Sequence, residues 1–444
     1  MDYIDSYRGP RCEGIEYASP AEVAAFQAPL LRETLAYVAA RSPFYRRLYA
    51  SHGVDLQAVR APEDLRLLPT VGKQALQAYN WDFACVPRST FRDLLTTSGT
   101  SGSPVVFGLT EGDLMRLGYN ESLSFYTAGC RAGDCIQLMT TVDRRFMAGL
   151  AYMLGARTLG VPLIRVGAGV PSLQLDTILR LQPTVAIAVP SFLIVLGQYA
   201  IAHHIPLGRL SLRRAICIGE SIRNQALELN MLGQKLHALW PELELLSTYA
   251  ATEMQTGFTE CSAHCGGHMH PELIVCEFLD EAGHPVKDDE PGELTITTLG
   301  VEGMPLVRFR TGDICTHYQA PCSCGRTSLR IGTVVGRKGQ MIKYKGTTFY
   351  PPALFDILDA LPWVQDYVVE AYTNDIGTDG LIVRIATAEA SERKTKELAD
   401  RFRAGVRVVP EVRYESAESL EHLKHPDGAR KEVRFIDSRH RPLP

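Results

Sequence analysis

Hydroxyl residues and glycines alternate in the segment TTSGTSGSP, residues 96–104, which precedes a predicted helix starting near Glu111. Glycines leave backbone N–H groups free to face an anion, and the Ser and Thr hydroxyls add hydrogen-bond donors. The segment is not a Walker A loop, because no Gly-Lys-Ser/Thr follows the glycines. A flexible surface linker has the same composition. From this segment alone, a phosphate cradle and a linker both stay open.

Three further polar motifs follow at intervals along the chain. YAATEMQ at 249–255 includes Glu253, RFRTGD at 308–313 ends on Asp313, and GRKGQMIKYKG occupies 336–346. A glutamate oxygen suits Mg²⁺, which is usually held by one or two carboxylates plus substrate phosphates. A lone glutamate is more often a solvated surface charge, and Thr-Gly-Asp is a common turn. Each motif is therefore weak evidence of a function by itself. The order of the motifs along the chain is more informative.

Cysteines and histidines gather in two segments, ECSAHCGGHMH at 260–270 and APCSCGR at 320–326. Together the segments hold four cysteines and three histidines. A Cys-x-Cys pair with an upstream cysteine and histidine is a plausible tetrahedral zinc set. The alternative is a group of reduced, partly buried thiols beside a histidine. A catalytic thiol is disfavoured, because the sequence places no general base beside one.

Composition excludes several classes of protein. The net charge of −4 and the pI near 6.3 offer no basic surface for nucleic acid. No apolar run reaches transmembrane length, and the N-terminus lacks the basic-then-apolar order of a signal peptide. The 11 cysteines are an odd number in a long chain, which argues against a secreted disulfide scaffold. We therefore expect a cytoplasmic enzyme without a membrane or nucleic-acid partner.

The sequence predicts the helices and buried strands that must position these motifs. Residues 20–50 have helical spacing that Pro43 ends, and from 112 to 260 helical stretches alternate with the apolar runs CIQLMT, VPLIRVG, VAIAVP, AICIGE and LELLSTY. Runs unbroken by polar alternation suit strands buried on both faces of a largely parallel sheet. Residues 273–335 look mainly β. The fold class is therefore α/β, with mixed or parallel sheets and helices in a large N-terminal domain.

A smaller domain is expected after a Gly- and Lys-rich linker at 336–346. Beyond it, 352–361 suits a helix, VQDYVVEAYT and GLIVRIAT suit strands, and 391–404 suits a charged helix. This pattern is α+β. We place the domain boundary so that residues 1–335 form the large domain and 336–444 the small one.

The order of the motifs TTSGTSGSP, YAATEMQ, RFRTGD and GRKGQMIKYKG, with a lysine near the C-terminus, resembles the adenylate-forming superfamily of acyl-CoA synthetases and adenylation domains. Within it the chain looks most like the phenylacetate–CoA ligase branch, over about residues 20–437. The resemblance implies that a small carboxylic acid attacks ATP to give an acyl-adenylate, from which CoA takes the acyl group as a thioester. A carrier-protein phosphopantetheine is the alternative acceptor. A non-catalytic nucleotide-binding scaffold is the alternative of another class.

The resemblance also implies roles for single residues of the large domain. The β- and γ-phosphates of ATP would be held by Ser98, Gly99, Thr100, Ser101 and Gly102. Ser103 stands where this branch often has lysine. Nucleoside contacts would come from Gly219, Glu220, Tyr249, Thr252 and Asp313, with Tyr249 stacking on adenine and Asp313 accepting from the ribose hydroxyls. Glu253 would be a catalytic residue that helps to hold Mg²⁺.

In the C-terminal part, Lys431 matches the lysine that bridges the carboxylate and the α-phosphate during adenylation, in register with Arg434 and Asp437. Arg430 replaces the family's preceding glycine, and Lys424 is the alternative lysine. Arg337 would reach the ribose or phosphate. The resemblance implies that residues 336–444 are a mobile cap, that Gly339 is its hinge in place of the usual Asp or Lys, and that Gly346 lines the path of the thiol.

The resemblance gives the metal set and the acid pocket as well. Some relatives carry a structural zinc at the cysteine segments, which implies the ligands Cys261, His268, Cys322 and Cys324, with Cys265 as the alternate. The acyl pocket would be lined by Phe146, Met147, Tyr152 and Phe192. These side chains would suit an aromatic or short hydrophobic acid. A homodimer is common among the relatives.

Overall fold

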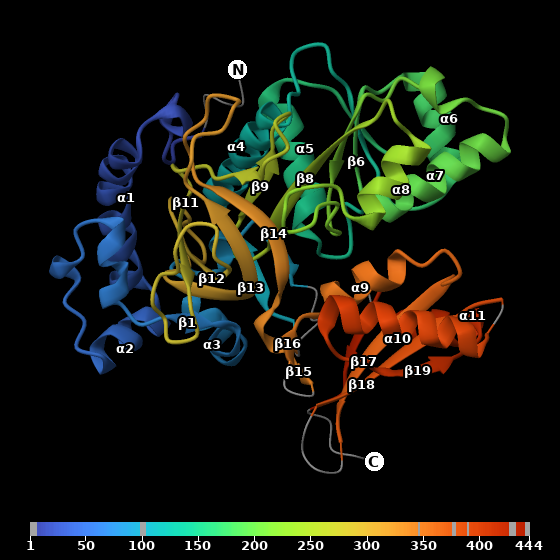
Figure 1. Ribbon diagram of the computed structural model, residues 1–444. Helices are drawn as coiled ribbons and strands as arrows, with labels where there is room; N and C mark the ends of the chain where they lie inside the picture. The colour runs from blue at the N-terminus through green and yellow to red at the C-terminus, as the bar shows by residue number, and fades with distance from the viewer. Residues whose placement is uncertain are drawn as a thin grey trace. The chain divides into compact units, whose positions relative to one another are not determined.

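The computed structural model describes residues 7–97, 104–344, 347–374, 379–388, 390–425 and 432–439. Contacts divide the chain into two compact units, Met1–Thr333 and Val334–Pro444, and each is described by itself. Figure 1 follows the chain through both units from the blue N-terminal helices to the red C-terminal strands. No helix in these described ranges is long and apolar enough to cross a membrane.

The first unit begins with helices and short turns. Ser19 closes a capping box with Glu22 before α1, and Pro43 opens α2 directly after α1 ends. The predicted helix over 20–50 is therefore two helices. The bounds in this region are α1 Pro20–Arg41, α2 Pro43–Ser51, α3 Lys73–Tyr79, β1 Val71–Gly72, β2 Asp93–Thr96, β3 Val106–Leu109, and 3₁₀ turns at Ile15–Tyr17, Leu56–Ala58, Pro62–Leu67, Asn80–Phe83 and Arg88–Thr90.

A parallel sheet in the order β5-β4-β6-β7-β8 follows. Helices connect its strands along the chain and pack around the sheet (Figure 1). Its strands are β4 Ile136–Leu138, β5 Leu163–Arg165, β6 Val185–Ala188, β7 Arg214–Cys217 and β8 Glu244–Ala251. Its helices are α4 Glu111–Thr127, α5 Met147–Leu159, α6 Pro171–Leu181, α7 Pro190–Ala202 and α8 Met231–Leu239, with a 3₁₀ turn at Leu207–Arg209. Each of the five apolar runs overlaps one strand, which confirms the predicted α/β class.

The same sheet continues as antiparallel strands in the order β8-β9-β10-β14-β13-β12-β11, and β1 pairs with β13. These strands are β9 Thr256–Glu260, β10 Gly267–His268, β11 Ile274–Leu279, β12 Gly292–Thr298, β13 Phe309–Tyr318 and β14 Arg330–Arg337. Both motifs that carry Tyr249 and Asp313 therefore belong to one sheet.

The guanidinium of Arg116 joins α4 to the loops around the antiparallel strands. It is fully buried and donates to the carbonyl oxygens of Leu299 at 2.8 Å, Gln255 at 2.7 Å and Leu273 at 2.6 Å. A buried charge is tolerated only when its donors are satisfied, and these carbonyls satisfy them. Gln255 closes the turn that contains Glu253, so Arg116 fixes that turn against the helix.

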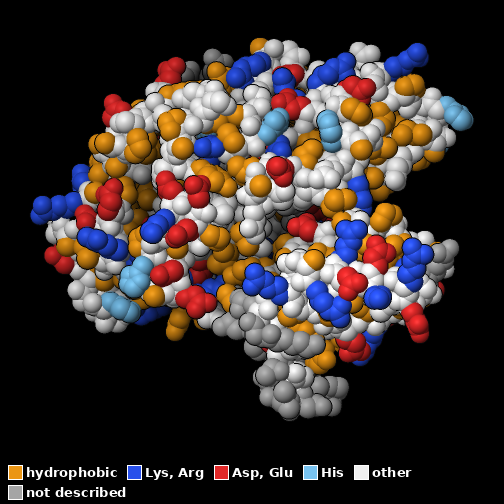
Figure 2. Space-filling view, viewed as in Figure 1, with side chains coloured by type: hydrophobic (Ala, Val, Ile, Leu, Met, Phe, Trp, Pro, Cys, Tyr) orange, Lys and Arg blue, Asp and Glu red, His pale blue; other side chains and the backbone are white. Residues whose placement is uncertain are grey.

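The second unit packs helices against a four-stranded sheet in the order β19-β18-β17-β20. Apolar side chains of α9, α10, β17 and β18 form one core cluster. The bounds are β15 Ile342–Tyr344, β16 Thr347–Phe349, α9 Pro351–Asp359, β17 Asp366–Thr373, β18 Asp379–Ala386, α10 Glu392–Val406, β19 Glu411–Tyr414, α11 Ala417–Lys424, β20 Phe435–Asp437 and a 3₁₀ turn at Lys338–Gln340. On the face shown in Figure 2, acidic and basic side chains are intermixed.

One carboxyl of the core makes stability depend on pH. Glu121 of α4 is buried, accepts from Asn120 Nδ2 at 3.0 Å, and burial raises its pKa to about 8. The folded-state pKa lies above the value in an unfolded chain. The stabilisation that the protonated carboxyl contributes is therefore fully present in acid, below the unfolded pKa, and is lost as the pH rises towards 8.

We expect Glu121→Gln to remove that loss. The unfolding free energy of the variant minus that of the unchanged protein should be about 3 kcal/mol larger at pH 8 than at pH 5, because only the unchanged protein loses stability as Glu121 ionises. Urea unfolding at several pH values measures the difference, and Glu33→Gln, on an exposed residue, is the control. Parallel pH profiles for the Glu121 variant and the unchanged protein would contradict the assignment.

Candidate functional site

Tyr249 and Asp313 meet although they come from distant strands. The Oη of Tyr249, on β8, donates to Oδ2 of Asp313, on β13, at 2.7 Å. Four strand spacings separate β8 from β13, which in a flat sheet is about 19 Å. The hydrogen bond therefore requires the sheet to curl, and Tyr249 and Asp313 lie on the inside of that curl.

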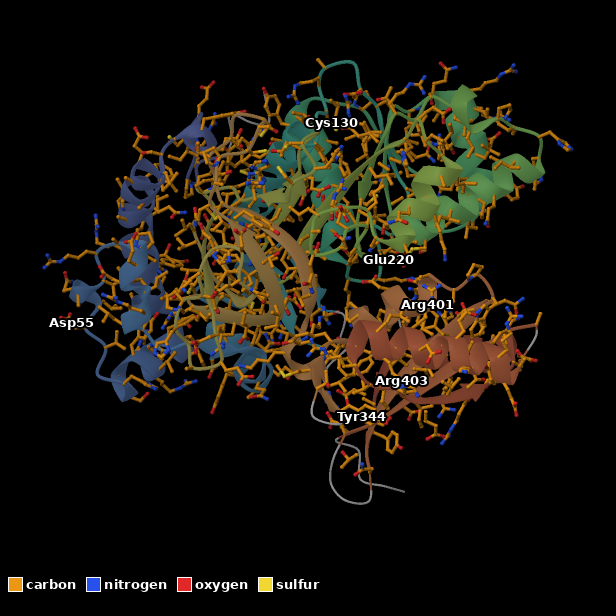
Figure 3. The ribbon with its side chains drawn as sticks, in the orientation of Figure 1. Asp55, Cys130, Glu220, Tyr344, Arg401 and Arg403 are labelled. Atoms are coloured by element: carbon orange, nitrogen blue, oxygen red, sulfur yellow. The ribbon has the colours of Figure 1, made fainter. Side chains whose placement is uncertain are left out.

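The turn after β7 carries Gly219 and Glu220. Gly219 has φ 79°, a left-handed conformation that glycine adopts without strain. The carboxylate of Glu220, labelled in Figure 3, accepts from the backbone N and the Oγ of Ser191 in the first turn of α7, both at 2.9 Å. The side chain of Glu220 therefore anchors the turn to a helix N-terminus, which leaves the backbone of the turn as the part that can meet a ligand.

Thr252 and Glu253 lie in the tight turn between β8 and β9, and both are half-buried. Gln255 ends this turn with φ 50°, and its carbonyl oxygen accepts from Arg116. The turn thus places Glu253 four residues after Tyr249. Arg116 holds the backbone of this turn through the carbonyl oxygen of Gln255. Sequence reasoning missed Arg116, because a lone arginine in a predicted helix gives no sign of burial.

The cysteine and histidine segments converge as the sequence predicts. The ligand atoms of Cys261, His268, Cys322 and Cys324 all lie within 4.8 Å of one another. Cys261 Sγ is 3.7 Å from Cys322 Sγ, and Cys324 Sγ is 3.6 Å from His268 Nε2. A tetrahedral zinc with its usual bond lengths has S···S edges of about 3.8 Å and S···N edges of about 3.6 Å. These two separations therefore match the edges of a tetrahedral site, and all four ligand atoms are near enough to share one metal ion.

Other contacts support this donor set. His268 Nδ1 lies 3.4 Å from Ser328 Oγ, which leaves Nε2 for a metal. Burial lowers the pKa of His268 to about 3, so the ring is neutral, as a ligand must be. Cys265 Sγ lies 3.3 Å from Cys322 Sγ, closer than two ligands of one tetrahedral zinc stand, and Cys265 is outside the four-residue cluster. These contacts favour the predicted set over its alternate.

The residues expected to line an acyl pocket occupy two places in the fold. Met147 and Tyr152 are buried on α5, and Phe146 stands just before that helix. Tyr152 packs in the core cluster that contains Phe125, whereas Phe192 of α7 packs against a different cluster. Tyr152 and Phe192 thus contribute to the core, and their part in a pocket stays a prediction.

In the second unit, Gly339 lies in the 3₁₀ turn Lys338–Gln340, and Arg439 donates to its carbonyl oxygen at 3.1 Å. Arg337 ends β14 and is exposed. Lys424 is buried and pairs with Asp366 at 2.7 Å and with Glu432. These pairs occupy Lys424, which weakens it as the alternative to Lys431.

Several predicted residues lie outside the described ranges: Ser98, Gly99, Thr100, Ser101, Gly102 and Ser103 of the phosphate loop, and Gly346, Arg430 and Lys431 of the C-terminal part. Their roles stay predictions. Thr97 and Val105, which are on either side of residues 98–103 in the sequence, are described, and the N of Thr97 donates to the carbonyl oxygen of Val105 at 3.0 Å.

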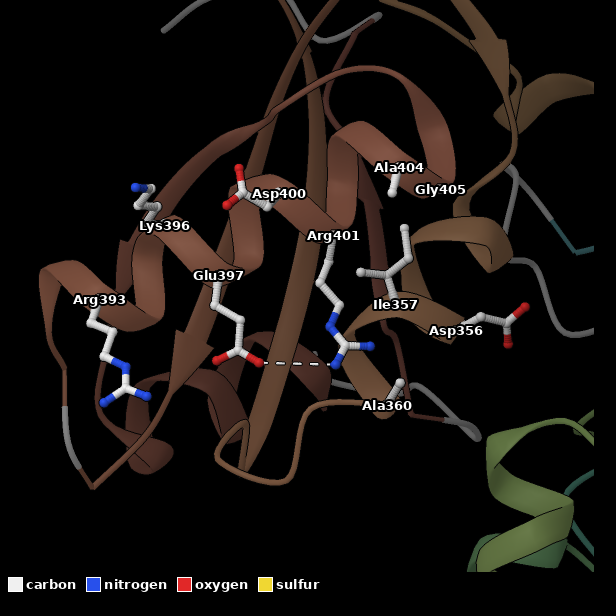
Figure 4. A pocket seen from close by; sticks show the side chains of 10 residues that line it. All are labelled: Asp356, Ile357, Ala360, Arg393, Lys396, Glu397, Asp400, Arg401, Ala404 and Gly405. Atoms are coloured by element: carbon white, nitrogen blue, oxygen red, sulfur yellow. Dashed lines mark ion pairs between the residues drawn. The ribbon is translucent and has the colours of Figure 1, made fainter.

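A surface groove of the second unit lies between α9 and α10 (Figure 4). Its walls mix charges of both signs, including the ion pair of Glu397 and Arg401 at 3.9 Å. None of the predicted site residues lines it. Mixed charge gives it no preference for an anionic or a cationic ligand, so we assign it no role.

Comparison with known proteins extends these findings. Residues 81–303 match the family model described as AMP-binding enzyme. The phenylacetate-coenzyme A ligase of Thermus thermophilus is 31% identical over 346 residues, which is 77% of this chain and 76% of that protein. The enzyme of that name from Escherichia coli is 27% identical and covers 87% of each chain. A solved 2-hydroxyisobutyryl-CoA ligase with 2-HIB-AMP, at 21% identity and TM-score 0.82, covers 96% of this chain and 92% of its own, and shares the fold.

Proposed function

Since the chain belongs to the AMP-binding enzymes, in the branch of the phenylacetate–CoA ligases, we propose how its own residues carry out the activity of that branch. The enzyme activates a carboxylic acid with ATP and passes the acyl group to CoA. The acid's oxygen attacks the α-phosphorus and pyrophosphate leaves. The sulfur of CoA then attacks the acyl carbon, AMP leaves, and the thiol proton passes to solvent.

The observation that carries this proposal is the contact between Tyr249 and Asp313. It brings the YAATE and RTGD motifs, 64 residues apart, to one point of the first unit. In our proposal the Tyr249 ring stacks on adenine and the carboxylate of Asp313 accepts from the ribose hydroxyls. The backbone of Gly219 and Glu220 meets the adenine edge. Because the Tyr249 phenol is already bonded to Asp313, both groups are oriented before a nucleotide binds.

Charge neutralisation is the main requirement of the first step, because a carboxylate approaches an anionic α-phosphate. We assign the phosphates to the backbone and hydroxyls of residues 98–102 and Mg²⁺ to Glu253, with Thr252 beside it. Lys431 would lie between the carboxylate and the α-phosphate, and Arg337 would reach the ribose or phosphate. The pair of Lys424 with Glu432 supports this, because it anchors the residue next to Lys431.

We further propose that residues 1–335 bind AMP and the acid while 336–444 act as a mobile cap pivoting at Gly339. Phe146, Met147, Tyr152 and Phe192 would face an aromatic or short hydrophobic acid, which fits the apolar character of α5 and α7. CoA is the acceptor that the relatives' names support. A carrier protein is the other outcome of the test below, and a homodimer stays a prediction.

The four-residue cluster fits structural zinc. Three thiolates and one imidazole are soft and borderline ligands, and four protein ligands leave no open position for chemistry. We propose that Cys261, His268, Cys322 and Cys324 hold zinc, which would tie the end of β9 to the turn after β13. None of the 11 cysteines forms a disulfide. The cytoplasmic location stays a prediction from the sequence.

The activity predicts that exchange of radioactive pyrophosphate into ATP depends on a carboxylic acid and on Mg²⁺. We expect aromatic acids such as phenylacetate to support exchange better than acetate, because the proposed pocket is apolar. Adding CoA or a phosphopantetheinylated carrier protein then identifies the acceptor by thioester formation. If no acid in a broad panel supports exchange at saturating ATP, the non-catalytic scaffold becomes the better interpretation.

The assignment of Lys431 predicts a split between the two half-reactions. Lys431→Ala should slow adenylation about 100-fold or more, because the cation between two anions is lost, while thioester formation from preformed acyl-adenylate changes little. Single-turnover assays of each half-reaction measure this. Lys396→Ala, on an exposed residue of α10, is the control. Equal losses in both half-reactions would remove the proposed role.

The metal assignment predicts about one zinc per chain in protein purified without added metal, measured by elemental analysis. Cys322→Ser should lose the zinc and lower the unfolding temperature, because metal binding stabilises the fold. Cys265→Ser should keep the zinc, as should the control Cys12→Ser. Loss of zinc from the Cys265 variant would instead make that thiol a ligand, and a folded, zinc-free parent protein would refute the site.

A further inference from the structure

A buried ion pair lies behind the turn that follows β7. Arg223 Nε is 2.6 Å from Oε1 of Glu260, and the two side chains are only 8% and 2% exposed. Arg223 belongs to the turn of Gly219 and Glu220, whereas Glu260 ends β9. The pair therefore joins the proposed adenine-binding turn to the antiparallel half of the sheet.

Both partners make further bonds that reach the proposed nucleotide site. The second oxygen of Glu260, Oε2, accepts from the backbone N of Ser247 at 2.9 Å, two residues before Tyr249. Arg223 Nη2 donates to the carbonyl oxygen of Leu245 at 3.3 Å, also on β8. One carboxylate and one guanidinium thus hold β8 and the adjacent turn in a single arrangement.

The turn is also held from its other side. Thr333 Oγ1 on β14 donates to the carbonyl oxygen of Asn224 at 2.8 Å, and Ser221 Oγ donates to that of Arg223 at 2.9 Å. With Glu220 bonded to Ser191, these contacts fix the side chains and flanks of the turn. The backbone around Gly219 and Glu220 is what remains available to a ligand.

Stability alone is a weak reason for such a pair. Removing two charges from water is costly, and apolar replacements of buried ion pairs are often neutral or stabilising. A pair that joins two elements of one site instead fixes their geometry, and misplacing a binding group by about 1 Å can cost about 100-fold in rate. The position of Arg223, inside the turn itself, favours this second reason.

We propose that Arg223 and Glu260 are positioning residues for the nucleotide, which hold the turn 219–224 at the correct distance from Tyr249 so that adenine fits between them. The inference rests on the proposed function, because that function puts adenine at this turn. Neither residue touches the reacting atoms. Substitution of either residue should therefore raise the Kd of ATP by a larger factor than it lowers kcat.

The test compares Arg223→Met, Arg223→Lys and Glu260→Gln with the unchanged protein. We expect Arg223→Met to raise both the Kd of ATP, measured by calorimetry, and the KM of ATP about tenfold or more. The KM of the acid and kcat should change less. Arg223→Lys should recover part of the affinity, since the charge remains while the bonds from Nη2 to the carbonyl oxygen of Leu245 and from Nη1 to that of Leu227 are lost. Circular dichroism and zinc content establish that each variant is folded.

A matched control is the pair of Arg214 and Glu244, which joins β7 to β8 at 3.0 Å on a surface where the side chains are 31% and 30% exposed. Arg214→Met should leave ATP affinity unchanged. If a folded Arg223→Met or Glu260→Gln protein binds ATP as the unchanged protein does, the inference is wrong and the pair is only structural. Should Arg223→Met fail to fold, the near-isosteric Glu260→Gln decides. Absence of acid-dependent exchange in the unchanged protein would instead refute the proposed function.

Discussion

The hydrogen bond between Tyr249 and Asp313 is the constraint on which the candidate site depends, since it requires a sheet of many strands to curl. A flat sheet would put β8 and β13 far beyond the reach of two side chains. The two-residue strand β10 and the change from parallel to antiparallel pairing at β8 lie within the bent region. The curl brings together motifs that the sequence keeps apart.

Buried charges keep that curled region in place. Arg116 holds the loops behind Glu253 through backbone carbonyls, and Arg223 with Glu260 holds the neighbouring turn. The cluster of Cys261 and its partners begins one residue after Glu260. Arg116, Arg223 and Glu260 are thus buried polar groups that hold the backbone near the proposed binding face. Apolar side chains could fill the same space, but they would form no hydrogen bonds that orient the backbone carbonyl and N–H groups of these turns.

The alternation of helical stretches and apolar runs was enough to predict strands β4 to β8 in a largely parallel sheet, because local hydrophobicity indicates burial on both faces. It did not reveal that the antiparallel strands continue the same sheet, nor that β1 joins β13, because such pairing depends on contacts distant in sequence. Residue type and spacing predicted a cysteine and histidine cluster, and the family resemblance selected its four proposed ligands. Arg223 was not, since nothing local separates a buried arginine from a solvated one, and a glutamate beside the cysteines was the only available signal.

The contact of Arg439 with the segment around Gly339 has a consequence for movement. Its guanidinium donates to the carbonyl oxygens of Gly339 and Met341 and is itself held by Asp379 and Asp437. Glycine makes peptide rotation at position 339 sterically easy. Turning that carbonyl nevertheless breaks a charge-assisted hydrogen bond. At the proposed hinge, an easily rotated glycine peptide is therefore combined with a charge-assisted hydrogen bond from a residue 100 positions away in the sequence.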